Sequence, residues 1–194
     1  MIRYFWFFIL SVLMSFSLSA QAAETYKLDP MHSYVIWYIK HLDFTTQSGK
    51  WYAEGTLTLD KDKPQDTKVD VTIPVGNIVT GLPELDQHLK GKLFFDVQQF
   101  PMATFVSNKV VVTGKDTAKV TGMLTLHGVS KPVTLNVKFN HAGINPITNK
   151  MTAGFSGNTT LKRSDFGMNT LLPAVGDDVK INIEVEAYKD DKQG

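Results

Sequence analysis

Residues 122–139 read GMLTLHGVSKPVTLNVKF, and this stretch decides the fold class. Strand side chains alternate between two faces, so each half of the stretch has one apolar and one polar side. The segment Gly128–Pro132 between the halves carries turn residues. The stretch therefore predicts an antiparallel hairpin with one continuous apolar face. In chain order, that face consists of Gly122, Leu124, Leu126, Val133, Leu135, Val137 and Phe139.

The same alternation recurs along the chain and predicts eight consecutive strands. They are Ser33–His41, Trp51–Asp60, Val69–Val75, Thr104–Thr113, Lys119–His127, Val133–Phe139, Met151–Leu161 and Val179–Val185. All but one of the connections are of hairpin length, which favours an all-β, eight-stranded antiparallel up-and-down β-barrel over the alternative, a β-sandwich. A barrel of this size is either filled by its own side chains or holds one small ligand. The pattern leaves both readings open.

Residues 77–101 form the one long connection. Pro83 suits the first turn of a helix, and Leu82, Leu85 and Leu89 give that helix an apolar side. Phe94 and Phe95 follow it. Long insertions of this kind in compact domains are often functional, so we expect a short helical insertion that forms a lid or mouth of the barrel. The alternative is a plug that serves stability alone.

The N-terminus has the pattern of a secretory signal peptide. Arg3 precedes a short apolar run, which ends before the small-residue pattern Ala20-Gln21-Ala22. A membrane-spanning helix needs about 20 apolar residues, and this run is shorter. We therefore expect residues 1–22 to be cleaved, leaving residues 23–194 as one barrel domain in the periplasm.

Composition narrows the class of partner. The chain has 20 Lys and Arg against 19 Asp and Glu, and no cysteine. The domain is long enough to form a core without disulfides. The near-neutral charge and the absence of a basic run argue against nucleic-acid binding. The expected partner is uncharged or weakly charged.

Catalytic and metal-binding motifs do not stand out. The five histidines form no metal-spaced pair, and His32 and His41 are nine positions apart, an odd spacing that places them on opposite faces of a regular strand. Gly154–Gly157 lacks one spacer of a nucleophile elbow. We predict no enzyme activity, no metal and no cofactor.

Several short blocks, in a fixed order and spacing, carry a family resemblance. They are Asp29-Pro30, His32-Ser33, Val35, Trp37, His41-Leu42, Asp86, His88-Leu89, Phe94-Phe95-Asp96, Pro101, Thr104-Phe105, Ser107, Gly122, Leu124-Thr125-Leu126, Gly128-Val129, Lys131–Leu135, Arg163–Gly167 and Glu186-Ala187. Together they resemble the YceI-like family of periplasmic, lipocalin-like polyisoprenoid-binding proteins over nearly all of residues 23–194. The chain departs from the family pattern at Leu85 and Gln87, where a basic residue is usual beside Asp86 and His88, at Lys90 in place of Arg, and at Asp43 in place of Gly.

The resemblance implies a barrel that encloses an apolar tunnel for an isoprenoid or similar long-chain amphiphile. On the predicted inner faces the lining would be Val35, Trp37, Ile39, Trp51, Leu57, Val71, Phe105, Leu135, Phe155 and Ile183, with Phe94 and Phe95 at the opening. The candidates to contact the polar end of the ligand are His32, His41, Lys90 and Arg163. Their alternative roles are backbone hydrogen bonds at strand ends for the histidines and an Arg163–Asp165 salt bridge in a turn.

Three rival functions stay open at this point. The first is an outer-membrane barrel, which would need apolar residues facing lipid and a polar lumen. The second is a lipid-acting enzyme with His32 or His41 as base. The third is a lipid-loaded accessory of a membrane redox protein, which differs only in its partner. The sequence also leaves open whether the chain forms a homodimer, and whether the lipid is transported, stored or sensed.

Overall fold

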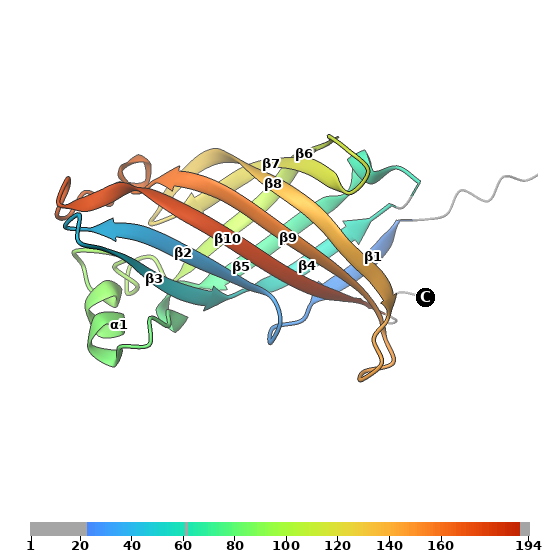
Figure 1. Cartoon of the computed structure of the whole chain (residues 1–194), viewed down its shortest axis with the longest axis horizontal. Helices are drawn as coiled ribbons and strands as arrows, with labels where there is room; N and C mark the ends of the chain where they lie inside the picture. Colours follow the sequence, from blue (N-terminus) through green and yellow to red (C-terminus); the bar gives the residue numbers. More distant parts are fainter. Residues whose placement is uncertain (1–22, 61, 191–194) are drawn as a thin grey trace, which may run out of the picture.

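The computed structural model describes residues 23–60 and 62–190, so the predicted signal peptide lies outside the described residues. In this part of the chain ten strands and one α-helix are arranged along one long axis (Figure 1). The strands are β1 (Glu24–Leu28), β2 (Tyr34–His41), β3 (Thr45–Tyr52), β4 (Glu54–Leu59), β5 (Lys68–Pro74), β6 (Met102–Val112), β7 (Thr117–Leu126), β8 (Val129–Ile144), β9 (Met151–Lys162) and β10 (Val175–Lys189). The helix is α1 (Pro83–Lys90), and the short 3-10 turns are η1 (Pro64–Asp66), η2 (Val75–Asn77) and η3 (Arg163–Phe166).

Strand β1 closes the sheet into a barrel. It pairs with β4 on one side, where Tyr26 faces Leu57, and with the end of β10 on the other, where Leu28 faces Ala187. The closed ring therefore contains eight strands, in the order β1-β4-β5-β6-β7-β8-β9-β10. The remaining hairpin, β2–β3, extends the wall along the rest of β10. This ring confirms the predicted eight-stranded antiparallel barrel and rules out the sandwich.

The hairpin predicted from residues 122–139 is formed by β7 and β8, but its turn is shorter than expected. Only His127 and Gly128 lie outside the strands, with φ angles of 51° and 75°. Two consecutive positive φ angles are typical of a tight two-residue hairpin turn, in which glycine is favoured. Residues 129–132, predicted as turn, belong to β8. Pro132 is tolerated there because this part of β8 pairs with β7 alone.

Two strands were missed by the sequence pattern. Strand β1 is short, and β3 begins Thr-Thr-Gln-Ser-Gly-Lys, without apolar alternation. Tertiary pairing nevertheless holds β3 along the full length of β2. The small residue Gly49 is required on its inner side, because a Cβ atom there would clash with the indole ring of Trp37. The predicted strand Trp51–Asp60 is interrupted at Ala53, where β3 ends and β4 begins.

Helix α1 lies at one end of the barrel, near the β2–β3 turn, while the β6–β7 turn, the start of β1 and the end of β10 lie at the other (Figure 1). Pro83 begins the helix, and the carboxylate of Asp86 accepts hydrogen bonds from the backbone N–H and hydroxyl of Thr80. This confirms the predicted helical insertion. Among the described residues, no helix is both long and apolar enough to cross a membrane.

Candidate binding cavity

The barrel encloses a main cavity of about 500 Å³ whose wall is almost entirely apolar. Inward-facing residues from nearly every strand form this wall. On β10, for example, Ile181 and Ile183 line the cavity, while Lys180 and Asn182 are exposed on the outside. Eight of the predicted lining residues lie here: Val35, Trp51, Leu57, Val71, Phe105, Leu135, Phe155 and Ile183. On β10 the apolar side thus faces the cavity and the polar side faces outward, which is the reverse of what an outer-membrane barrel requires.

A β-bulge keeps the long strand β6 facing the cavity. The bulge lies between Ser107 and Lys109 and changes which residues point inward. Phe105 lines the cavity before the bulge, and Val110 and Val112 line it afterwards. A strict period of two across this strand would have turned the two valines outward.

A second cavity, of about 140 Å³, lies at the α1 end of the barrel. Its wall is apolar throughout. Of the predicted residues, Trp37, Ile39, Phe94, Phe95 and Arg163 contribute to it, and Arg163 presents its aliphatic stem. The predicted placement of Phe94 and Phe95 beside a barrel end agrees with this position, and their contact with a ligand stays a prediction.

Trp51 contributes to the walls of both cavities and is 8% exposed. Its indole Nε1 donates a hydrogen bond of 2.9 Å to the carbonyl of Val75. The Phe95 ring packs edge-on against it at a centroid distance of 5.2 Å, and the Trp37 ring lies 6.2 Å away. These contacts fix the Trp51 ring between the two spaces.

Polar residues gather where the main cavity reaches the end of the barrel opposite α1. The connection between β4 and β5 contributes Asp60 and Thr67, the β6–β7 turn contributes Lys115 and Asp116, and the start of β7 contributes Thr117. We call these five residues the polar mouth. Sequence reasoning missed them, because short polar residues in turns have no pattern that separates a mouth from an ordinary turn.

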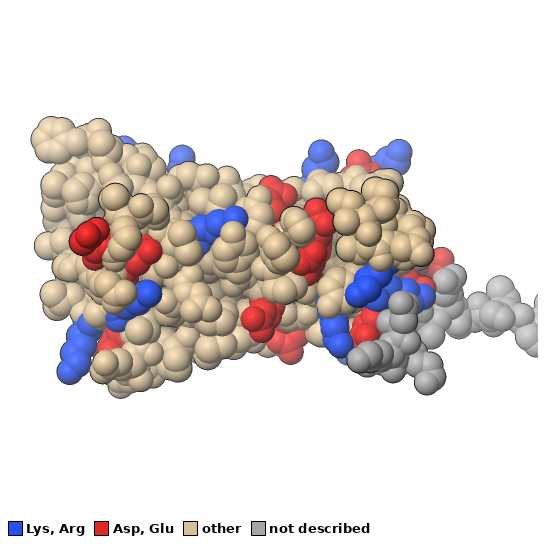
Figure 2. Space-filling model, turned by 90° about the horizontal axis from the view of Figure 1, so that it is seen from below, with Lys and Arg blue, Asp and Glu red and all other residues tan. Residues whose placement is uncertain are grey.

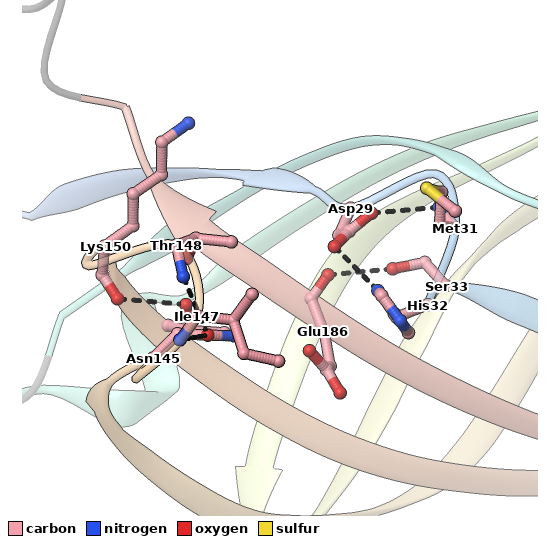
Figure 3. A network of polar contacts seen from close by, with 10 residues as sticks. Asp29, Met31, His32, Ser33, Asn145, Ile147, Thr148, Lys150 and Glu186 are labelled. Carbon is pink, nitrogen blue, oxygen red and sulfur yellow. Dashed lines mark hydrogen bonds and ion pairs between the residues drawn. The ribbon is translucent and has the colours of Figure 1, made fainter.

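His32 lies at the corner between β1 and β2, outside both cavity walls (Figure 3). Its Nδ1 lies 2.8 Å from a carboxylate oxygen of Asp29. This hydrogen bond and the negative charge of Asp29 raise the pKa of His32. Burial alone would raise the pKa of Asp29, but hydrogen bonds from His32 and from the N–H of Met31 lower it overall.

The same corner brings three groups together that could coordinate a metal ion. One ligand atom from each of Asp29, His32 and Glu186 lies within 4.8 Å of the other two. Both Asp29 oxygens already accept hydrogen bonds, from Met31 and His32. The backbone carbonyl of Glu186 accepts hydrogen bonds from the N–H of Asp29 and the hydroxyl of Ser33, each 2.8 Å long. These hydrogen bonds therefore occupy the Asp29 carboxylate and join the corner between β1 and β2 to β10.

His41 and Lys90 also lie outside both cavity walls. His41 ends β2, and its backbone carbonyl accepts a hydrogen bond from the N–H of Phe44 in the β2–β3 turn. Lys90 ends α1. His32 precedes β2 and His41 is its last residue, so the two histidines lie near opposite ends of this strand. They therefore cannot contact the same head group.

Arg163 is buried, with 7% of its surface exposed, and is bound to the protein itself. Its guanidinium donates three hydrogen bonds of 2.8 Å, to the carbonyls of Met168, Val175 and Gly176. Burial lowers its pKa, and the charge of Asp177 partly offsets this effect. The alternative Arg163–Asp165 salt bridge is wrong, because Asp165 pairs with Lys131 at 3.7 Å. Through these three hydrogen bonds, Arg163 stabilises the loop between β9 and β10 and holds it against the start of β10.

Charged side chains on the outer surface are mixed in sign. On the face shown in Figure 2, Lys and Arg are interspersed with Asp and Glu, without a continuous basic patch. That face therefore lacks the basic patch that is typical of a nucleic-acid-binding surface.

Comparisons with known proteins extend over most of the chain. A UPF0312 protein of Pseudomonas putida strain W619 is 39% identical over 173 residues, which cover 88% of each chain. Among solved structures, BcnA of Burkholderia cenocepacia superposes with a TM-score of 0.72 at 27% identity, covering 82% of this chain and 98% of that one. A Campylobacter jejuni YceI protein gives a TM-score of 0.69 at 31% identity, covering 78% and 90%.

A more distant structure shares the fold. A domain of Saccharophagus degradans, described as polyisoprenoid-binding, superposes with a TM-score of 0.64 at 14% identity, covering 88% of this chain and 100% of that one. The family model described as the YceI-like domain matches residues 26–187, from the middle of β1 to Ala187 near the end of β10, where the pairing of β10 with β1 begins. The barrel, the sequence relatives and this match together show that the chain belongs to the YceI-like family.

Proposed function

We propose that this protein binds one long-chain isoprenoid, or a similar amphiphilic lipid, inside its barrel and carries or sequesters it in the periplasm. The observation that supports this most is the continuous apolar wall of the 500 Å³ cavity. Its volume lies within the range of ligand sites, about 300–1,000 Å³. Close packing of a protein interior would leave few voids larger than a water molecule.

The physical gain of such a complex is the removal of an apolar chain from water. Burial returns about 0.8 kcal/mol per CH₂ group, although the costs of ordering the ligand and losing its translational freedom offset much of this sum. A long chain therefore needs a continuous apolar wall more than it needs polar anchors. Strands β5, β6, β8 and β10 supply that wall through residues such as Val71, Phe105, Leu135 and Ile183.

The polar end of the ligand would lie at the polar mouth. The four candidates chosen from sequence are poorly placed for this role, since three lie outside the cavity walls and Arg163 is engaged with backbone carbonyls. At the mouth, the side chains of Lys115 and Thr117 can donate hydrogen bonds, and those of Asp60 and Asp116 can accept them. This mixture suits an uncharged or weakly charged head group.

The relatives favour binding over catalysis. A neighbour with the same fold is described as polyisoprenoid-binding, and the family match spans the whole barrel. We therefore propose a binding protein without enzymatic activity. An accessory role beside a membrane redox protein would use the same lipid site and differ only in the partner.

The periplasmic location rests on the N-terminal sequence alone. Arg3, the apolar run and Ala20-Gln21-Ala22 support export and cleavage before Ala23. The intact mass of the exported chain checks this. A chain that keeps residues 1–22 in a membrane fraction would contradict it.

The binding proposal can be tested with solanesol, a long prenol, added to delipidated protein while tryptophan emission is followed. Phe105 and Val106 are neighbours on β6 that face opposite ways, since Phe105 lines the cavity and Val106 is 48% exposed. Phe105→Glu should abolish binding, because an unpaired buried charge is costly. Val106→Glu, the matched control, should bind like the wild type.

A second variant covers the case in which Phe105→Glu does not fold. Leu135→Trp keeps the wall apolar but fills part of the main cavity, so it should weaken solanesol binding while the barrel stays folded by circular dichroism. Wild-type protein that binds no prenol, or a folded Leu135→Trp variant that binds it as tightly as the wild type, would refute the cavity as the binding site.

A further inference from the structure

Four side chains separate the main cavity from the smaller one at the α1 end. Each of them lines both spaces, so together they form the partition between them. They are Trp51, Leu126, Leu161 and Ile181. The partition is drawn from β3, β7, β9 and β10, which are distant in the chain and of which only β9 and β10 are direct neighbours in the sheet.

Trp51 is the rigid member of this partition. A leucine or isoleucine can change rotamer as a ligand arrives, but the Trp51 ring is held by its hydrogen bond to Val75 and by the edge-on contact with Phe95. Moving the ring would leave the carbonyl of Val75, a residue only 2% exposed, without this hydrogen bond. The ring therefore resists displacement by an apolar chain.

The space behind the partition is suited only to an apolar group. Ile39, Phe95 and Val179 line it, and its wall exposes no polar atom. The polar mouth includes the β6–β7 turn, which lies at the end of the barrel opposite α1 (Figure 1). The chain of an amphiphile anchored there would run through the main cavity toward Trp51. Each further carbon of that chain would have to pass the indole ring to stay buried.

We propose that Trp51 is the residue that sets the chain length of the bound lipid, by ending the main cavity and closing off the smaller one. This inference rests on the proposed lipid-binding function. A lipid whose chain reaches Trp51 fills the main cavity, whereas a longer one leaves part of its chain exposed at the mouth and gains nothing from the added carbons. Without the indole ring, the smaller cavity becomes an extension of the larger one.

The test compares delipidated wild type, Trp51→Ala and Trp51→Phe with a series of linear prenols, namely farnesol, geranylgeraniol and solanesol. Affinities are measured by competition and occupancy by native mass spectrometry. Trp51→Ala should raise the affinity for solanesol relative to geranylgeraniol by about tenfold, since several more carbons become buried. Trp51→Phe loses the same hydrogen bond but keeps a ring, so its preference should shift much less.

Two further variants separate passage through the partition from a general gain of volume. Phe155→Ala removes an aromatic ring that lines only the main cavity, so it should not reproduce the shift. Ile39→Trp fills only the smaller cavity. Alone it should leave the wild-type preference unchanged, and combined with Trp51→Ala it should cancel the gain.

The outcomes distinguish this inference from the proposed function. Wild-type protein that binds none of the prenols would overturn both. If the wild type binds prenols but folded Trp51→Ala keeps the same chain-length preference, Trp51 does not set the chain length. The same conclusion follows if Phe155→Ala shifts the preference as much as Trp51→Ala does. In both cases the proposed lipid binding is unaffected.

Discussion

The indole Nε1 of Trp51 donates a hydrogen bond of 2.9 Å to the backbone carbonyl of Val75. A second tryptophan, Trp37, packs beside it with its ring centroid 6.2 Å away. Among the described residues, the Nε1 of Trp37 is buried without a hydrogen-bond partner. The two rings are 8% and 7% exposed, so they differ in hydrogen bonding rather than in burial.

This pair predicts unequal costs for the same substitution. Trp51→Phe leaves the Val75 carbonyl without its donor, whereas Trp37→Phe removes an unsatisfied N–H. We expect Trp51→Phe to lower the free energy of unfolding by about 1–2 kcal/mol more than Trp37→Phe does. Urea denaturation of both variants measures the difference. Equal losses, or a larger loss for Trp37→Phe, would mean that the Trp51–Val75 hydrogen bond contributes no net stability.

Arg163 is predicted to support the fold rather than the ligand. Lysine cannot reproduce three hydrogen bonds from a planar guanidinium to separate carbonyls, so Arg163→Lys should destabilise the protein by about 2–4 kcal/mol. Solanesol affinity of the folded variant should be unchanged. Lys131→Ala is the control, because its exposed contact with Asp165 should contribute less than about 1 kcal/mol. If Arg163→Lys lowers the affinity for solanesol without lowering the free energy of unfolding, Arg163 contacts the head group after all.

The Asp29–His32 pair predicts a pH window of added stability. The pKa of His32 is raised from 6.5, so its contribution is complete below 6.5 and is lost as the pH rises through the raised value. The pKa of Asp29 is lowered from 3.8, so its contribution is complete above 3.8 and is lost as the pH falls through the lowered value. The pair should therefore stabilise the protein most between these two ordinary values.

His32→Gln should accordingly lower the free energy of unfolding more at about pH 5 than at about pH 8. Chemical denaturation at the two pH values measures this difference. His41→Gln, near the other end of β2, removes an imidazole without touching Asp29 and serves as the comparison. NMR titration of wild-type protein should give His32 a pKa above 6.5. A cost of His32→Gln that is the same at both pH values would show that the ion pair does not act in folding.

Phe95 is predicted to act on both stability and ligand exchange. Phe95→Ala removes the edge-on contact with Trp51 and should lower the free energy of unfolding by about 2 kcal/mol. It should also speed solanesol release in stopped-flow exchange, because Phe95 helps to hold the Trp51 ring that ends the main cavity on the α1 side. Phe94→Ala removes a ring that packs against His88 and lines the same small cavity. If both variants lose stability but exchange ligand at the wild-type rate, the segment is a plug and not a lid.

The sequence predicts the inner surface of the barrel well where alternation is strict. On β10, Ile181 and Ile183 alternate with Lys180 and Asn182, and the structure places the first two on the cavity wall. Strand β3 could not be predicted in this way. Its first residues are polar, and long-range pairing with β2 holds them in the sheet.

The polar features were harder to predict for a different reason. Arg163 follows β9 in a motif that the sequence shares with the YceI-like family, but only the folded loop reveals that three backbone carbonyls engage its guanidinium. Lys115 and Asp116 are ordinary turn residues in the sequence. The pairing of β5 with β6 brings their turn beside the β4–β5 connection and makes both part of one mouth.

Native mass spectrometry of protein purified without detergent is the most direct test of whether the 500 Å³ cavity holds a lipid chain. We expect one noncovalent adduct per chain, with the mass of a long apolar isoprenoid or similar amphiphile, which is released on denaturation. A bare polypeptide mass for the purified protein, together with no adduct after incubation with solanesol, would contradict it.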